Sequence, residues 1–165
     1  MEFKSFFSDV ISTIVGGGLL TFIFFLLRER VYKSIDLDGT WVYEQITEIS
    51  DFNPYIDMKI RYLALISLEG KNICGSAEKI YDRTADGNER EYVGKNRTLV
   101  DITGHLEKNY LSKDKISIHI REFGEKRQSS TFHKLMVVDN NTIRGTFSST
   151  VANQQGKAEW IRRSS

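Results

Sequence analysis

The sequence predicts an all-β protein, an eight-stranded antiparallel up-and-down β-barrel, preceded by an N-terminal transmembrane α-helix. Three observations predict this fold class. One long apolar run, residues 10–27, contains no charge and no proline. From Gly39 onward, apolar and polar residues alternate with period two, which is typical of strands. Turn residues interrupt this alternation at short intervals, so successive strands should be antiparallel neighbours.

The apolar run is long enough to cross a membrane, because roughly 18 helical residues rise about 27 Å. A buried core helix would show a polar stripe, whereas the apolar side chains here point all around the axis. One basic residue, Lys4, precedes the run, and Arg28, Arg30 and Lys33 follow it. Because basic flanks tend to stay in the cytoplasm, we expect the N-terminus outside and the barrel inside.

A cleaved signal peptide is the alternative interpretation of the run. It would carry its positive charge before the apolar residues and a small-residue cleavage site after them. Here Arg-Glu-Arg follows the run instead. The sequence therefore favours a retained membrane anchor.

Small residues within the run suggest a surface for helix packing. Gly16, Gly17 and Thr21 lie near one another at helical spacing, and small residues let helices approach closely in lipid. Glycine and threonine are also simply common in membrane helices. Self-association of the helix and a plain lipid-facing role both remain open.

Bulk composition limits the remaining chain to one domain. We expect residues 1–33 to form the membrane helix and its flanks, and residues 34–165 a single cytoplasmic ligand-binding barrel. The 23 basic and 22 acidic residues give a formal charge of +1, which disfavours binding to long nucleic acid. The single cysteine, Cys74, cannot form an internal disulfide and fits a reducing compartment.

Eight strands are expected, with turns centred on such residues as Gly70, Gly87 and Gly124. Closing them into a barrel would pair both edges of the sheet. A two-layer sandwich is the alternative, but it needs longer crossing connections. The expected strands are residues 39–49, 59–68, 73–81, 98–106, 115–121, 128–138, 142–150 and 157–163.

Motifs for catalysis or metal binding are lacking. The three histidines, His105, His119 and His133, lie on separate expected strands without metal-ligand spacing. No nucleophile elbow or phosphate-binding glycine loop occurs in the expected barrel, and Glu44 and Glu48 suit the solvent face of the first strand. We therefore expect no enzymatic activity, no metal and no cofactor.

A binding cavity is the remaining possibility, because an eight-stranded barrel can hold one small ligand. If Trp41 points inward, alternation directs Tyr43, Gln45 and Thr47 inward too. In the second strand the inward row would be Ile60, Tyr62, Ala64 and Ile66, where Tyr62 could contact a planar base.

The inward face of strand 142–150 is left open by the pattern. Ile143, Gly145, Phe147 and Ser149 form one face, and Thr142, Arg144, Thr146 and Ser148 form the other. Arg144 facing water is the simpler interpretation. If the barrel mouth is polar instead, a guanidinium and hydroxyls could meet an anionic ligand. The candidate ligand-binding residues are Tyr43, Gln45, Thr47, Tyr62, Thr131, Arg144 and Thr146.

The two ends of the expected barrel resemble lipocalin-like proteins. Gly39-Thr40-Trp41 opens the first strand, and Trp160-Ile161-Arg162-Arg163 ends the last. In such barrels the first and last strands pair, so a tryptophan from one end meets an arginine from the other. The resemblance implies that Trp41 and one of the two arginines seal the closed end.

A membrane segment joined directly to such a barrel also resembles a bacterial antiphage family, the transmembrane β-barrel effectors of cyclic-oligonucleotide signalling systems. The resemblance implies an inner-membrane protein whose barrel binds a cyclic di- or oligonucleotide from a partner nucleotidyltransferase. Binding would control homo-oligomerisation and disruption of membrane lipid, causing growth arrest or abortive infection. A related arrangement has the opposite sign, with ligand holding the effector quiet. This chain has one evident span where two are usual.

Two other functions remain open from the sequence. One is a membrane-tethered carrier or sensor of an apolar small molecule, whose cavity would be lined by Tyr62, Ile66, Phe132, Met136 and Phe147. The other is a filled structural barrel that binds only partner proteins. A nucleotidyltransferase gene beside this one would favour the antiphage effector.

Overall fold

The structure is a computed structural model that describes residues 2–31, 35–109, 112–123 and 128–163. The chain forms two bodies, a helix and a β-barrel, which are described separately. The turn expected at Gly124 and the flanking residue Lys33 lie outside the described residues.

Helix α1 spans Glu2–Val31 and contains the apolar run. Its segment Phe7–Leu27 is long and apolar enough to cross a membrane, by length and composition. A signal sequence would meet the same two criteria, and the predicted orientation stays a prediction. Within the helix, the Thr21 hydroxyl donates to the backbone oxygen of Gly17 at 2.8 Å, so this polar group is satisfied locally.

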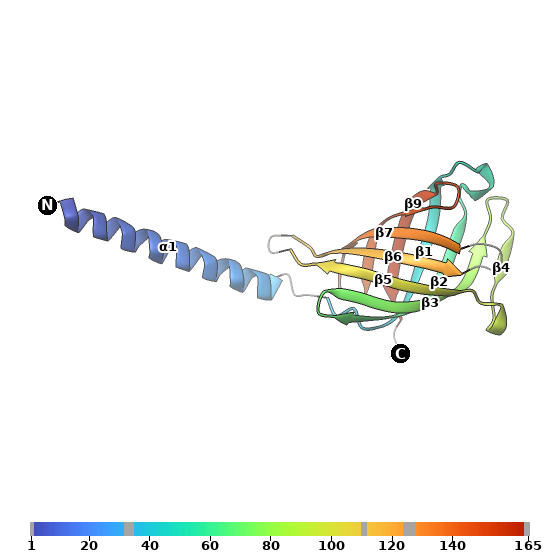
Figure 1. Ribbon diagram of the computed structural model, residues 1–165, viewed down its shortest axis with the longest axis horizontal. Helices are drawn as coiled ribbons and strands as arrows, with labels where there is room; N and C mark the ends of the chain where they lie inside the picture. The colour runs from blue at the N-terminus through green and yellow to red at the C-terminus, as the bar shows by residue number, and fades with distance from the viewer. Residues whose placement is uncertain (1, 32–34, 110–111, 124–127, 164–165) are drawn as a thin grey trace. The chain divides into compact units, whose positions relative to one another are not determined.

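The barrel is a closed, eight-stranded antiparallel sheet, as predicted (Figure 1). Each strand pairs with its neighbours, β1 lies between β2 and β9, and the β2–β3 pairing completes the circle. The sandwich alternative is wrong, because the strands close on themselves as one sheet. The barrel strands are β1 Gly39–Ile49, β2 Lys59–Glu69, β3 Asn72–Arg83, β5 Leu99–Glu107, β6 Lys115–Phe123, β7 Gln128–Val137, β8 Thr142–Ser149 and β9 Gln155–Arg162.

Three short elements lie outside the eight strands. Strand β4, Glu89–Glu91, pairs with the last residues of β3, and the pairing continues where the Tyr92 amide donates to the backbone oxygen of Ile80 at 3.0 Å. Two single 3-10 turns, η1 at Asn53–Tyr55 and η2 at Gly94–Asn96, follow β1 and β4. The sequence pattern predicted neither turn.

The end of the barrel at which the chain enters β1 is packed and sealed. Trp41 is fully buried, and its indole donates to the backbone oxygen of Leu37 at 2.9 Å. The guanidinium of Arg162 lies 4.7 Å from the Trp41 ring centre and donates to the backbone oxygens of Asp38 at 2.7 Å and of Asp36. The predicted tryptophan–arginine seal is confirmed, with Arg162 as the arginine.

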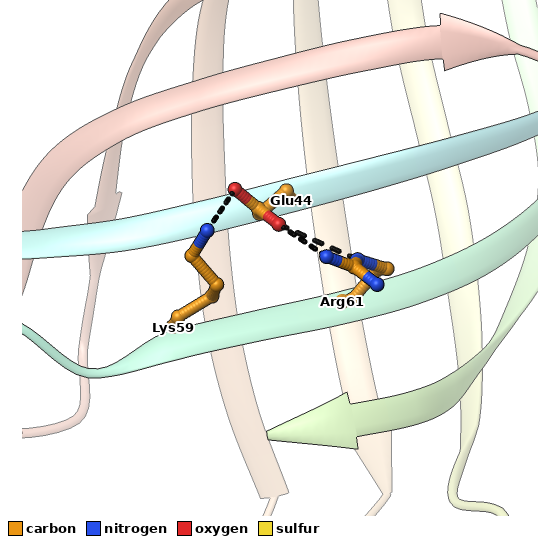
Figure 2. Close-up of polar contacts among 3 residues, drawn as sticks. All are labelled: Glu44, Lys59 and Arg61. Carbon is orange, nitrogen blue, oxygen red and sulfur yellow. Dashed lines mark hydrogen bonds and ion pairs between the residues drawn. The ribbon is translucent and has the colours of Figure 1, made fainter. Parts of the chain in front are cut away.

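The outer face of β1 and β2 carries an ionic cluster rather than a site (Figure 2). The carboxylate of Glu44 accepts from Lys59 at 2.8 Å and from Arg61 at 2.9 Å. Burial raises the pKa of Glu44, but the hydrogen bonds from Lys59 and Arg61 outweigh burial and lower the pKa below its usual value. Glu44 thus faces outward, as alternation predicts, and its contacts pin the two strands together.

Candidate functional site

The barrel interior changes from apolar at the sealed end to polar at the opposite, open end. All four residues of the predicted β1 row, Trp41, Tyr43, Gln45 and Thr47, are buried. On β2, Tyr62, Ala64 and Ile66 are buried as predicted, and Ile60 is partly buried. These two rows therefore bring aromatic and amide side chains to the base of the open end.

Three aromatic rings are stacked across the middle of the barrel. Tyr43 lies between Tyr62 and Trp160, with ring centres 4.6 Å and 4.3 Å away and nearly parallel planes. The Tyr43 hydroxyl is buried and has no hydrogen-bond partner among the described residues. Burial, and secondly the charge of Glu122, raise the pKa of both tyrosines well above 10, so both keep their protons.

A buried histidine, His133 on β7, fixes the orientation of Gln45. The Trp160 indole nitrogen, which can only donate, lies 3.0 Å from Nδ1 of His133, so that atom accepts. Burial lowers the pKa of His133 to about 3, so the ring is neutral and its proton is on Nε2. The structure places the amide nitrogen of Gln45 2.6 Å from this Nε2. Two donors cannot share this contact, so we assign the Gln45 amide the reversed orientation, in which its oxygen faces Nε2.

A pocket of about 220 Å³ lies above this network, at the open end. Its wall is about equally polar and apolar, with hydroxyl and amide groups contributed by several strands and connections of the barrel. Such a mixture of apolar surface and a few convergent polar groups is typical of small-molecule sites. The pocket is lined by Gln45, Tyr55, Met58, Ile60, Tyr62, Lys79, Glu122, Ser129, Thr131, Ser149, Val151 and Gln154. It is called the inner pocket below.

Glu122, at the end of β6, is the acidic group in the inner pocket. The Tyr62 hydroxyl donates to its Oε2 at 3.0 Å. Within residues 35–109, 112–123 and 128–163, no other group hydrogen-bonds to the Glu122 carboxylate, so that part of the chain leaves Oε1 to a ligand. An anionic acceptor at a partly dry site makes stronger hydrogen bonds than a neutral one.

A β-bulge in β3 brings an acidic group beside the basic group of the pocket. The register shifts between Arg61 and Tyr62, which face Tyr81 and Lys79 across β3, so Ile80 is the extra residue. A bulge redirects the side chains beyond it. Lys79 lines the inner pocket by regular alternation with the buried residues Ile73 and Ala77, which precede the bulge. The bulge turns Asp82 inward, where it pairs at 2.7 Å with Lys79 and accepts from Tyr92 at 2.7 Å.

A second cavity, of about 490 Å³, adjoins the inner pocket and is called the outer pocket. The two share Tyr55 and Met58, which come from the β1–β2 connection. That connection is tied to the β8–β9 connection, because the Asp51 amide donates to the backbone oxygen of Ala152 at 2.9 Å. The outer pocket is lined by Pro54, Tyr55, Met58, Thr84, Ala85, Asp86, Asn88 and Arg90.

The structure brings together five of the seven predicted site residues and separates two. Tyr43, Gln45, Thr47, Tyr62 and Thr131 lie in or directly beneath the inner pocket, where Thr131 bonds the Ser149 hydroxyl at 3.2 Å. Arg144 and Thr146 face outward instead. Burial of Ile143 and Phe147 forces the alternate residues of β8 to the outer surface, where Arg144 pairs with Glu159.

The apolar lining predicted for a carrier is also wrong in part. Tyr62, Ile66 and Phe147 are buried, but Phe132 and Met136 are about half exposed on the outer face of β7. His133 and Leu135 take the inward positions of that strand. The interior thus gains a polar imidazole where the carrier interpretation needs apolar side chains.

The site residues missed from the sequence include Lys79, Glu122, His133 and Gln154. The alternation around Leu135 could have placed His133 inside, and the alternation from Ile116 to Ile120 could have done so for Glu122. The bulge that redirects Asp82 toward Lys79 has no sequence pattern of its own. In the described part of the chain no group of His, Cys, Asp and Glu could hold a metal ion.

The sequence matches no protein-family model, and no curated protein matches it. Among solved structures, the chain is similar to a de novo designed fluorescence-activating β-barrel. The identity is 14%, the alignment covers 78% of this chain and 94% of that chain, and the TM-score is 0.47. The fold assignment above rests on the strand pairing within this chain.

Proposed function

We propose that this protein is a membrane-anchored sensor whose barrel binds a small polar ligand at its open end. The observation that carries the proposal is the contrast within one barrel. The sealed end is filled by fully buried apolar side chains, whereas the open end keeps a polar pocket of about 220 Å³. Barrels of this size hold one ligand in such a mouth.

The charges of the pocket indicate which part of a ligand would enter. Lys79 and Asp82 neutralise one another, and Glu122 adds a negative charge. A phosphate group would therefore be repelled from the inner pocket. The outer pocket is lined by Arg90, whose guanidinium suits phosphate oxygens, as well as by Asp86. A nucleotide with its base in the inner pocket and its phosphate toward Arg90 matches both cavities.

We propose, further, that the ligand is a cyclic di- or oligonucleotide and that the protein is an antiphage effector of the kind its sequence resembles. The two adjoining pockets together suit a molecule larger than one base. Ligand binding would shift contacts between barrels, and tethering would raise the effective concentration of the helices for each other. Oligomerisation would then control disruption of the membrane and arrest growth.

Titrating the full chain in detergent micelles with cyclic di- and trinucleotides tests the sensor directly. A ligand that binds only the folded state at 100 times its Kd should raise the melting temperature of the barrel by about 5 to 10 °C. Linear dinucleotides serve as the control and should give a smaller shift. Absence of a shift with every cyclic nucleotide, in protein whose circular dichroism shows a folded barrel, would contradict the proposal.

Replacing Gly17 by leucine tests the proposed role of the helix. A Cβ added at Gly17 meets no atom within 4 Å, so leucine fits the single helix without strain. We expect G17L to weaken helix association about tenfold and to reduce growth arrest on expression, with ligand binding unchanged. V15L, on the opposite side of the helix, is the matched control. Equal growth arrest in G17L and the unmodified protein would argue against packing through this face.

A further inference from the structure

The orientation of Gln45 decides which hydrogen bonds the inner pocket offers. Because Trp160 donates to Nδ1 of His133, Nε2 of that ring is a donor, and the amide of Gln45 beside it is assigned with its oxygen toward Nε2. In this orientation the NH₂ group is the end left for other partners. Gln45 lines the inner pocket, and among the described residues its amide has no further hydrogen-bond partner. The floor of the inner pocket therefore presents a hydrogen-bond donor.

Glu122 presents the opposite polarity in the same pocket. Its carboxylate accepts one bond from Tyr62 and retains acceptor capacity on both oxygens. A carboxylate accepts two parallel N–H groups in a bidentate arrangement, and such charge-assisted bonds are strong. A ligand complementary to this pocket therefore carries one hydrogen-bond acceptor and two adjacent hydrogen-bond donors.

We propose that the inner pocket selects a guanine-type base. The edge of guanine presents a carbonyl oxygen beside a ring N–H and an exocyclic NH₂. The carbonyl oxygen would accept from Gln45, and the two donors would meet Glu122. This assignment deepens the proposed function and rests on it, because it takes the inner pocket as the place where the ligand's base enters.

Other bases fit this pattern less well. Adenine places a ring nitrogen lone pair where guanine has an N–H, so it would face the Glu122 carboxylate with like polarity. Hypoxanthine keeps the carbonyl and the ring N–H but lacks the exocyclic amine. Uracil offers one N–H between two carbonyl groups, which leaves half of the carboxylate unpaired. The expected order is guanine, then hypoxanthine, then adenine.

The test compares guanosine, inosine and adenosine, together with cyclic di-GMP and cyclic di-AMP, by calorimetric titration of the full chain in detergent. We expect guanosine to bind about tenfold more tightly than inosine and about a hundredfold more tightly than adenosine. The E122Q variant should lose this preference. Its matched control is E107Q, an exposed glutamate on β5, which should keep it.

The outcomes separate this inference from the proposed function. Guanine preference in the unmodified protein that E122Q removes and E107Q retains would support it. Equal or tighter binding of adenosine and cyclic di-AMP would overturn the base assignment and leave the sensor proposal standing. Failure of every nucleoside and cyclic nucleotide to bind the folded protein would overturn both. The guanosine–inosine comparison needs no variant, so it decides the question even if E122Q does not fold.

Discussion

Replacing Trp41 by alanine should lower the free energy of unfolding of the barrel by about 3 to 5 kcal/mol. Trp41 is fully buried, its indole donates a hydrogen bond to the backbone oxygen of Leu37, and its ring contacts the Arg162 guanidinium. The variant loses all three contacts and leaves a cavity at the sealed end. Because small domains are stable by about 5 to 15 kcal/mol, much of the protein should unfold at moderate temperature.

Guanidinium titration of the full chain in detergent, followed by far-ultraviolet circular dichroism, measures this loss. Only two tryptophans occur in the sequence, so fluorescence of Trp160 alone reports on the W41A barrel. The matched control is F123A, an aromatic truncation at a residue that is 48% exposed, where we expect a loss below about 1 kcal/mol. A similar small loss for W41A would show that the sealed end contributes little to stability.

Acidification should destabilise the barrel through His133 by about 2 to 3 kcal/mol between pH 7 and pH 4.5. The pKa of His133 is about 3 in the folded protein and near 6.5 when unfolded. Between these values the unfolded chain binds a proton that the folded chain does not. The free energy of unfolding therefore falls by about 1.4 kcal/mol for each pH unit below 6.5, until the folded histidine itself is protonated near pH 3.

The contribution of His133 is isolated by comparison with H133Q, since carboxylates also titrate in this range. Glutamine can still accept from Trp160 and donate to Gln45, so the variant should fold. The measurement is the free energy of unfolding of both proteins at several pH values. We expect the unmodified protein to lose about 2 to 3 kcal/mol more than H133Q by pH 4.5. Parallel pH profiles would mean that His133 is already protonated or solvated in the folded state.

Period-two alternation predicted most of the barrel because one face of nearly every strand is apolar. It placed β1 at residues 39–49, the observed bounds, and directed Tyr43, Gln45 and Thr47 inward. The same rule, applied to β8, favours Ile143 and Phe147 inside. The prediction of Arg144 and Thr146 as ligand-binding residues gave more weight to ligand chemistry than to this pattern, and the structure places both outside.

The remaining site residues were missed because polar side chains obscure the alternation that identifies an inward face. Functional positions interrupt the apolar pattern that reveals a strand's inward face, so Glu122 was taken as the start of a turn although β6 continues through Phe123. Asp82 points toward Lys79 only because of the bulge at Ile80, whereas Lys79 itself continues the alternation of Ile73 and Ala77. Bulges change register without changing composition.

The pairing of β1 with β9 determines when, during synthesis, the barrel can close. Asp38 and Arg162, which bond across the sealed end, are 124 residues apart in the sequence. β9 must be inserted between β1 and β8, so the ribosome must release the chain through β9 before the circle can close. Until then both flanking strands have unpaired edges, which are prone to aggregation. A premature stop codon before Gln155 should therefore yield an insoluble product that is cleared by proteases rather than a partly active barrel.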